Sequence, residues 1–594
     1  MKLLNELKEI SRGFRTTVSF LERKEKINLA ISAVLMLFAG FLVNLPAVIL
    51  GKFVDEIIDL SNPTFMVAVP FLVIIIAIIL LKEVLTVIRK YLVENIATQT
   101  DKKLTVKTVG HLLKTDIVEF INKYQIGALH GRIFRSIQGL IKLIKLGFLD
   151  FFPSFFAAIA AIAIAFYQKP ILASFMILVI PTGLFIVVKQ VSSQKGIRVS
   201  LLRGKEKIDG KVVEMMGGLE TIRVADTTNF EIGKVENIAE DLRKIEIKHH
   251  IYMMFYDAAK YLNEAFFYIL VVSISIYFAV NGYITKGDIL TYSILFMSIL
   301  NPLGTIHRIL DEAHESSIKV QDLDDLLTQP LDKSFITYSK DKAESDSQFA
   351  LELKNLSFAY PQKNETALKK INLAISTGEK VGIAGSSGCG KSTLIKIILK
   401  LLHGYSGEIH FLGQNLNTLS REELAKKVSY IPQKTYIFSG TIRENVTYGV
   451  DELKDVEEII NALKKANIYA EVINVLGGLN GKVAENGNNL SGGQKQRLTL
   501  ARLILKAPEI LILDEATSAL DNTNEMVIQK NIEDIFANKT IITIAHRLTT
   551  LKNTDRILVF DEGQIVQEGK FLELSEKKGQ FKDFLEQNAK FKKE

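Results

Sequence analysis

One stretch decides the fold of the C-terminal part of the chain: Gly385-Ser386-Ser387-Gly388-Cys389-Gly390-Lys391-Ser392-Thr393. It fits the pattern G-x-x-x-x-G-K-[ST] of a phosphate-binding loop, between a strand-like run, Val381–Ala384, and a helical run, Thr393–Leu401. Glycines let backbone N–H groups point at phosphate oxygens at a helix N-terminus. We predict that Lys391 contacts the β- and γ-phosphates and that Ser392 ligates Mg²⁺. A glycine-rich turn without a ligand is the alternative, and it leaves the Lys-Ser-Thr sequence unexplained.

A second motif lies further along the chain, where the apolar strand Ile510–Leu513 ends in two acids, Asp514 and Glu515. Asp514 is the predicted acid on the Mg²⁺ side, and Glu515 is placed to polarise an attacking water. On its own, an acid pair at a strand end is usually a solvated terminus or a helix cap. The phosphate loop upstream favours the catalytic interpretation.

The surroundings of both motifs indicate a separate C-terminal domain. Short strand-like runs such as Thr540–Ile544 alternate there with amphipathic helical runs, which is typical of a parallel α/β domain. We assign this domain to residues 350–594, a normal size for one soluble domain. Residues 328–349 are polar and lack periodicity, and we interpret them as a linker.

The N-terminal part of the chain is much more apolar. Mean hydropathy is +0.19 over the whole chain although 23% of residues are charged, which indicates one very apolar part and one water-soluble part. Apolar runs long enough to span a membrane occur only before residue 310. They are Ile27–Leu50, Phe65–Ile88, Leu146–Gln168, Ile171–Lys189, Ala265–Val280 and Ile289–Ile306. Residues 1–327 are therefore predicted to form an all-α, six-helix transmembrane domain.

The distribution of charge predicts the orientation of this domain. Two long polar segments, after the second and fourth runs, carry Lys and Arg near the membrane, so they should be cytoplasmic together with the N-terminus and the C-terminal domain. We expect a multi-pass protein of the cell inner (plasma) membrane. The net charge of +7 fits such loops, and no basic run points to nucleic acid. The single cysteine, Cys389, allows no internal disulfide, and no cleavable signal peptide is visible.

A third motif, Leu490-Ser491-Gly492-Gly493-Gln494, precedes a long helical run, Lys495–Leu505. Ser491 can cap that helix, and glycines allow the close approach of a phosphate. A cap explains the serine but not the two glycines and Gln494. With this motif between the phosphate loop and the acid strand, the chain resembles the exporter-type ATP-binding cassette (ABC) half-transporters over nearly its whole length.

The resemblance implies roles for further residues. Tyr360 resembles the aromatic residue that stacks on adenine, and Gln433 the glutamine that meets Mg²⁺ and couples to the membrane domain. Asp521 resembles the acid of a loop that crosses the dimer interface, and His546 the histidine that contacts the γ-phosphate. For Tyr360 and His546 the structural alternatives are a core aromatic and a lone histidine after a strand.

The implied site has three sets of residues. The catalytic set is Glu515, His546 and Gln433, and the metal set is Ser392, Gln433 and Asp514. The nucleotide-binding set is Tyr360, Gly385, Ser386, Gly388, Cys389, Gly390, Lys391, Ser392, Thr393, Ser491, Gly492, Gly493, Gln494 and Asp521.

The fold implied by the resemblance is a six-helix transmembrane domain followed by an α/β P-loop ATPase cassette, with the loops His111–Arg132 and Glu214–Ala225 contacting the motors. The implied function is ATP-driven export of a small molecule, lipid, drug or peptide through the lipid bilayer by alternating access. An importer on the exporter fold, for example for a metal chelate, stays open. A soluble cassette acting on nucleic acid or ribosomes does not fit the spans.

The resemblance also implies a dimer, because ATP is held between the phosphate loop of one cassette and the Ser491 motif of the other. A homodimer is sufficient, since all catalytic positions carry competent residues; a heterodimer stays open. These positions are Lys391, Gln433, Ser491, Asp514, Glu515 and His546.

The sequence does not specify the cargo. His307, Asp311 and His314 share one face of the helix after the last span, and Glu264 begins the fifth run. They form either an acidic-histidine mouth for cationic or metal-bearing cargo, or ordinary ion pairs on a helix extension.

Overall fold

The computed structural model describes residues 2–59, 65–116, 126–193, 196–335, 348–360, 365–433, 435–450, 454–514, 522–545 and 548–590. The chain divides into two compact units. The helical unit comprises Met1–Thr115 and Glu119–Pro330, and the cassette comprises Asp116–Val118 and Leu331–Glu594.

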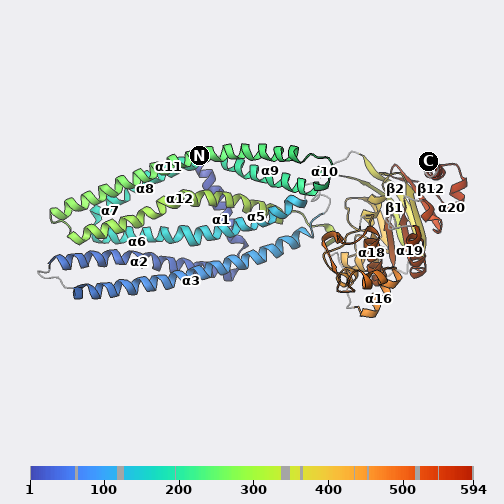
Figure 1. The fold of residues 1–594 in the computed structure, drawn as a ribbon, viewed down its shortest axis with the longest axis horizontal. Helices are drawn as coiled ribbons and strands as arrows, with labels where there is room; N and C mark the ends of the chain where they lie inside the picture. The colour runs from blue at the N-terminus through green and yellow to red at the C-terminus, as the bar shows by residue number, and fades with distance from the viewer. Residues whose placement is uncertain are drawn as a thin grey trace. The chain divides into compact units, whose positions relative to one another are not determined.

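The helical unit is built from long α-helices and one π-helical turn (Figure 1). Their bounds are α1 Lys2–Phe20, α2 Arg23–Asp59, α3 Phe65–Leu112, α5 Ile126–Lys145, η1 Leu146–Phe151, α6 Phe152–Gln168, α7 Pro170–Ile177, α8 Val179–Ser193, α9 Ile197–Gly217, α10 Leu219–Val224, α11 Thr228–Val280 and α12 Lys286–Leu327. Within the described residues, 6 helical stretches are long and apolar enough to cross a membrane. Each contains one of the predicted runs, which confirms the six-helix prediction.

Several of these helices continue far beyond their apolar run. A span needs about 20 residues, whereas α11 has 53 and α3 has 48. At 1.5 Å per residue, α11 is about 80 Å long. The polar segments between the predicted runs are therefore largely helical extensions of the spans themselves. Side chains on the outer faces of the spans, such as Ile74, Leu80 and Val87 of α3, are apolar and exposed, as contact with lipid requires.

Small and polar residues allow α2 to pack closely against its neighbours. The side-chain amide of Asn44 is buried and donates to the backbone oxygen of Ala157 in α6 at 2.8 Å. Gly51 meets Gly287 of α12 so closely that a Cβ on Gly287 would lie 1.9 Å from the Gly51 carbonyl oxygen. Any side chain at Gly287 would push the two helices apart.

The cassette contains 12 strands among the residues that the structure describes. They are β1 Phe349–Ala359, β2 Thr366–Ser376, β3 Lys380–Gly385, β4 Ser406–Phe411, β5 Gln414–Asn415, β6 Val428–Ile431, β7 Gly440–Thr441, β8 Lys482–Val483, β9 Ile510–Asp514, β10 Thr540–Ile544, β11 Arg556–Asp561 and β12 Gln564–Gly569. Its helices are η2 Lys333–Phe335, α13 Lys391–Ile398, α14 Arg421–Lys427, α15 Ile442–Val446, α16 Val456–Lys465, α17 Tyr469–Asn474, η3 Glu485–Gly487, α18 Gly492–Lys506, α19 Asn522–Ile535, η4 Leu548–Leu551, α20 Phe571–Glu576 and α21 Gln580–Lys590.

The main sheet has the strand order β12-β11-β3-β10-β9-β6. All neighbouring pairs from β11 to β6 are parallel, and β12 is antiparallel at the edge. This confirms the α/β prediction, and β10 spans the predicted residues.

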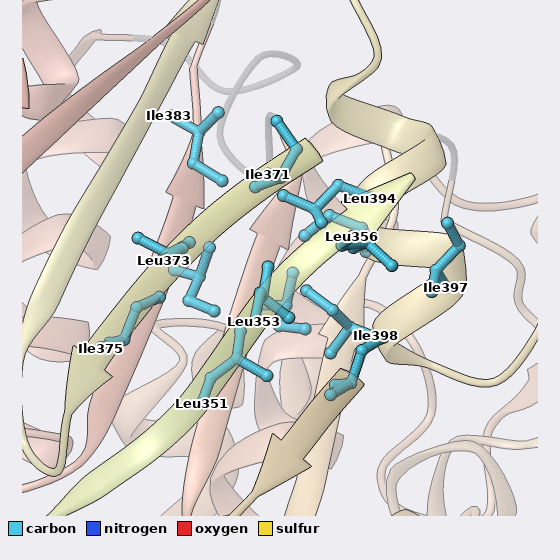
Figure 2. Packing of buried hydrophobic residues seen from close by; sticks show 14 of the residues in the cluster. Leu351, Leu353, Leu356, Ile371, Leu373, Ile375, Ile383, Leu394, Ile397 and Ile398 are labelled. Carbon is cyan, nitrogen blue, oxygen red and sulfur yellow. The ribbon is translucent and has the colours of Figure 1, made fainter. Parts of the chain in front are cut away.

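A second, antiparallel sheet of order β2-β1-β4-β5 was not predicted. Its apolar side chains, such as Leu353 and Leu373, pack with Ile383 of β3 and Leu394 and Ile398 of α13 in one buried cluster (Figure 2). The short alternating runs in β1 bury every second side chain over part of the strand, as expected for a strand with one face on the core.

Polar contacts hold the segment Leu331–Phe335 against the rest of the cassette. Asp332 is 2% exposed and its Oδ1 lies 2.7 Å from Nε2 of His403. Asp332 also accepts from the backbone N–H of Ser334 at 2.7 Å, and Arg421 donates to the Ser334 hydroxyl at 3.0 Å. Burial alone raises the pKa of Asp332, but the hydrogen bonds from His403 and Ser334 outweigh it and hold that pKa at about 2.

We expect Asp332→Ala to destabilise the cassette. A hydrogen-bonded buried carboxylate contributes about 2 kcal/mol to the free energy of unfolding. The folded-state pKa is depressed, so this stabilisation is complete above the unfolded pKa near 4 and disappears as the pH falls toward about 2. Thermal unfolding of the full-length protein in detergent at pH 7 should show a lower midpoint for Asp332→Ala. The exposed control Asp583→Ala should unfold like the wild type; equal midpoints for both variants would show that the contact contributes nothing.

Candidate functional site

The phosphate loop lies between β3 and α13, in the predicted order. Gly388 and Gly390 have φ angles of 86° and 106°, a region that disfavours any residue with a Cβ. A Cβ on Gly390 would also lie 2.8 Å from the backbone oxygen of Ala367. Both glycines are therefore required by the shape of the loop.

The backbone of the loop holds the side chain of Lys391 in place. The Lys391 ammonium donates to the backbone oxygens of Gly385 and Ser386, both at 2.8 Å, and only 6% of the residue is exposed. Its Nζ also lies 3.6 Å from Sγ of Cys389. A bound nucleotide can offer phosphate oxygens in place of the two carbonyls, which leaves the ammonium satisfied in both states.

Strand register brings Asp514 to the same end of the sheet as the phosphate loop. Ile383 of β3 pairs with Ile544 of β10, and Ile544 pairs with Asp514 of β9. These three residues are thus level across three adjacent parallel strands, and the outer two strands are roughly 10 Å apart. Asp514 is 9% exposed at this end. A ligand bound at the phosphate loop therefore lies within reach of its carboxylate or of an ion between them.

Other predicted residues surround this end of the sheet. The Tyr360 hydroxyl lies 3.2 Å from Oγ1 of Thr393, and its ring packs edge-on against Phe358. Ser392 is exposed in the first turn of α13. Gln433 is exposed just after β6, the strand next to β9.

The Ser491 motif forms the start of α18. The Ser491 hydroxyl accepts from the backbone N–H of Gln494 at 3.2 Å, and the Gln494 side chain accepts from the backbone N–H of Ser491 at 2.9 Å. Gln494 also donates to Glu471 at 2.9 Å. A reciprocal cap thus explains Gln494 as well as Ser491, contrary to our reading of the sequence. Gly492 next to Ser491 is exposed, so this helix end faces outward with free backbone donors.

Sequence reasoning missed one contact at the site. The Tyr430 hydroxyl donates to Oδ2 of Asp514 at 3.2 Å. Burial and the charge of Asp514 raise the pKa of Tyr430, so the hydroxyl keeps its proton. Tyr430 stands three residues before the predicted ligand Gln433, and that proximity in the sequence was the available signal.

Three predicted residues, Glu515, Asp521 and His546, lie outside the described residues, as does the side chain of His307. Glu515 directly follows Asp514 in the sequence, and His546 follows the last residue of β10 by two positions.

Two sets of polar residues in the helical unit bear on the predicted cargo site. His314 is buried, and its Nε2 lies 2.9 Å from Glu9 of α1, which favours a structural ion pair for this histidine. The second group, which we call the α11 polar cluster, lies within the helical unit. It consists of Gln190 of α8 and of Asp257, Lys260, Asn263 and Glu264 of α11.

The α11 polar cluster is partly buried. Lys260 is 5% exposed and its Nζ lies 2.8 Å from Asp257, which accepts from the fully buried Gln190 at 3.4 Å. Glu264 lies one turn beyond Lys260 and close to Gly304 of α12, where an added Cβ would be 3.8 Å from its Oε1. Charged groups in a spanning helix are costly, and they usually face a partner or a pathway.

Comparison with known proteins adds family relationships. The family profile "ABC transporter transmembrane region" matches residues 29–303, and the profile "ABC transporter" matches residues 368–518. A "Putative export ATP-binding/permease protein" of Rickettsia bellii is 30% identical over 500 residues, which cover 83% of this chain and 84% of the relative. An "ATP-dependent lipid A-core flippase" of Desulfotalea psychrophila is 27% identical, covering 94% of this chain and 96% of the relative.

Two further similarities extend this comparison. "Heavy metal tolerance factor 1" of Caenorhabditis elegans is 27% identical, covering 96% of this chain and 72% of the relative. A solved structure described as a bacterial Atm1-family ABC exporter with ATP bound superposes with a TM-score of 0.83. It covers 95% of this chain and 99% of its own at 22% identity, which supports the same fold.

We expect N-ethylmaleimide to inhibit nucleotide hydrolysis through Cys389. The thiol belongs to the phosphate loop, and Cys389 is only 5% exposed, so its reaction requires the loop to open and should be slow. Bound ATP should prevent the reaction, and Cys389→Ala should be resistant. Hydrolysis rates before and after labelling check this; inhibition that persists in Cys389→Ala would contradict it.

Proposed function

Because the chain belongs to the ABC transporter family, we propose that it is an exporter half-transporter driven by ATP hydrolysis at the cassette. The strand register that aligns Ile383, Ile544 and Asp514 carries this proposal, because it brings the phosphate loop and the acid at the end of β9 to the same end of the sheet. The same chain also has six candidate membrane spans among its described residues. A complete exporter of this kind has two groups of six spans and two cassettes, so this chain would supply half of one.

We assign the steps of hydrolysis to residues of this chain. Lys391 binds the β- and γ-phosphates after leaving the carbonyls of Gly385 and Ser386. Glu515 orients the attacking water, and His546 contacts the γ-phosphate. Tyr360 stacks on adenine; for this, its ring needs an accessible face, and the residue is only partly buried.

Mg²⁺ is expected to bind together with ATP. The Ser392 hydroxyl, the Asp514 carboxylate and the Gln433 amide are the oxygen donors that Mg²⁺ prefers, and they lie at the same end of the sheet. Bound Mg²⁺ would neutralise charge that develops on the phosphates. Mg²⁺ at nucleotide sites is usually held by one or two carboxylates together with substrate phosphates.

We further propose a homodimer. The outward-facing start of α18, at Ser491 and Gly492, would complete the ATP site of a second copy, because a helix N-terminus favours bound phosphate. A heterodimer with a related chain is the alternative. We place the protein in the cell inner (plasma) membrane with the cassette in the cytoplasm, which follows from basic residues beside the spans.

For cargo, we propose an amphiphilic molecule, such as a lipid or drug, whose polar end meets the α11 polar cluster. Lys260 is buried and its ammonium pairs with the partly exposed carboxylate of Asp257, so Glu264 is the further negative charge that would attract a cation. Peptides and metal conjugates are alternatives. An importer on the same fold is distinguished by the direction of ATP-driven movement in proteoliposomes.

Glu515→Gln tests the assignment of the hydrolytic site. We expect ATP binding to persist and turnover to fall by roughly 100-fold or more, because we assign the orientation of the attacking water to Glu515. The measurements are ATP binding and phosphate release by the full-length protein. Glu509→Gln, an exposed carboxylate before the same strand, is the matched control. Near-normal hydrolysis in Glu515→Gln would show that another group positions the water.

Glu264→Gln, with and without Asp311→Asn, tests the cargo proposal. The ratio of cargo-stimulated to basal ATP hydrolysis should fall for cationic amphiphiles and stay unchanged for neutral amphiphiles. Glu240→Gln is the control, because Glu240 lies on the same helix but pairs with Arg243 at an exposed position. Unchanged stimulation by both compound classes would make the α11 polar cluster a purely structural feature.

A further inference from the structure

Tyr430 links two strands that flank the site. It lies in β6, where it pairs with Ile512 of the parallel strand β9. Side chains alternate along a strand, so Ile512 and Asp514 share one face, and Tyr430 lies beside them on that face. The hydroxyl therefore reaches diagonally toward the end of β9, where it donates to Oδ2 of Asp514 at 3.2 Å.

The contact restrains the carboxylate of Asp514. Asp514 is the last residue of β9, and its carboxylate can rotate about the Cβ–Cγ bond. A hydrogen bond to one named oxygen sets that rotation, and a donor to a carboxylate forms one of the stronger hydrogen bonds in proteins. The Tyr430 ring is held in turn by the buried cluster that it packs against.

We propose that Tyr430 is a positioning residue for Mg²⁺, which orients the Asp514 carboxylate before nucleotide and metal arrive. The inference rests on the proposed role of Asp514 as the metal-side acid. At metal sites in general, loss of a hydrogen-bond partner that orients a metal ligand lowers metal affinity by about 10- to 100-fold. Gln433 lies two residues beyond the end of β6, so β6 and the residues after it would supply both a ligand and the residue that orients another ligand.

The alternative is that Tyr430 only satisfies its own hydroxyl at a partly buried position. The two explanations differ in what the loss of the hydroxyl changes. An orienting hydroxyl changes metal affinity and leaves metal-free ATP binding alone. A hydroxyl that only stabilises the strand changes both together, or neither.

Tyr430→Phe in the full-length protein separates them, because it removes the hydroxyl and keeps the ring. Binding of Mn²⁺ in the presence of ATP, followed by electron paramagnetic resonance, should weaken by about tenfold. ATP affinity in EDTA should match the wild type. Tyr405→Phe is the matched control, since the Tyr405 hydroxyl donates to Asn417 at 3.1 Å in another part of the cassette. Mn²⁺ affinity within about twofold of wild type in Tyr430→Phe, or an equal loss in EDTA, overturns the proposal.

The variant Asp514→Asn keeps this test separate from the proposed function. We expect it to lose most Mn²⁺ affinity, and Tyr430→Phe to add little further loss in that background. If Asp514→Asn binds Mn²⁺ like the wild type, the assignment of Asp514 itself is wrong. If the second substitution costs as much in the Asp514→Asn background as in the wild type, the tyrosine acts independently of the carboxylate and the positioning role is refuted.

Discussion

The parallel pairing of β3, β10 and β9 is the constraint on which the cassette depends. Parallel strands end on the same side of a sheet, so the loop after β3 and the acid at the end of β9 meet there without further adjustment. Left-handed glycines then let the loop turn into α13 while Lys391 stays bonded to loop carbonyls. The neighbouring strand β6 adds Tyr430 to the same end of the sheet, and Gln433 follows that strand. The carboxyl ends of these parallel strands therefore carry most of the described site.

A different constraint shapes the helical unit. Lipid offers no hydrogen-bond partners, so each span must satisfy its own backbone, and the unit is built from helices within its described residues. Their contacts use close approaches such as Gly51 against Gly287 and single polar bonds such as Asn44 to Ala157. Lys260 and Asp257 stand out against this background, because burial of the Lys260 ammonium carries a desolvation cost that its pairing with the partly exposed Asp257 must offset.

Sequence patterns predicted the features that depend on local periodicity. Apolar runs located the six spans, and strand-like runs located β3, β9 and β10. Patterns failed where distant residues meet. The bond from Tyr430 to Asp514 joins positions 84 residues apart, and the Asp332–His403 contact joins positions 71 apart, with no periodic signal for either. The antiparallel sheet was missed because β1 and β2 alternate irregularly around their bulges. The capping role of Gln494 was overlooked, although Ser491 and Gln494 have the S-x-x-Q spacing of a capping box.

The proposed division of each ATP site between two cassettes requires a second cassette. Coexpression of Lys391→Ala protomers with Ser491→Arg protomers measures this directly, after purification of the mixed dimer through two different tags. Each homodimer has only damaged sites, whereas the mixed dimer has one site with an intact phosphate loop and an intact Ser491 motif. A shared site predicts that the mixed dimer occludes Mg²⁺-ATP and hydrolyses it above the rate of either homodimer. A mixed dimer as inactive as both homodimers would contradict a site divided between two chains.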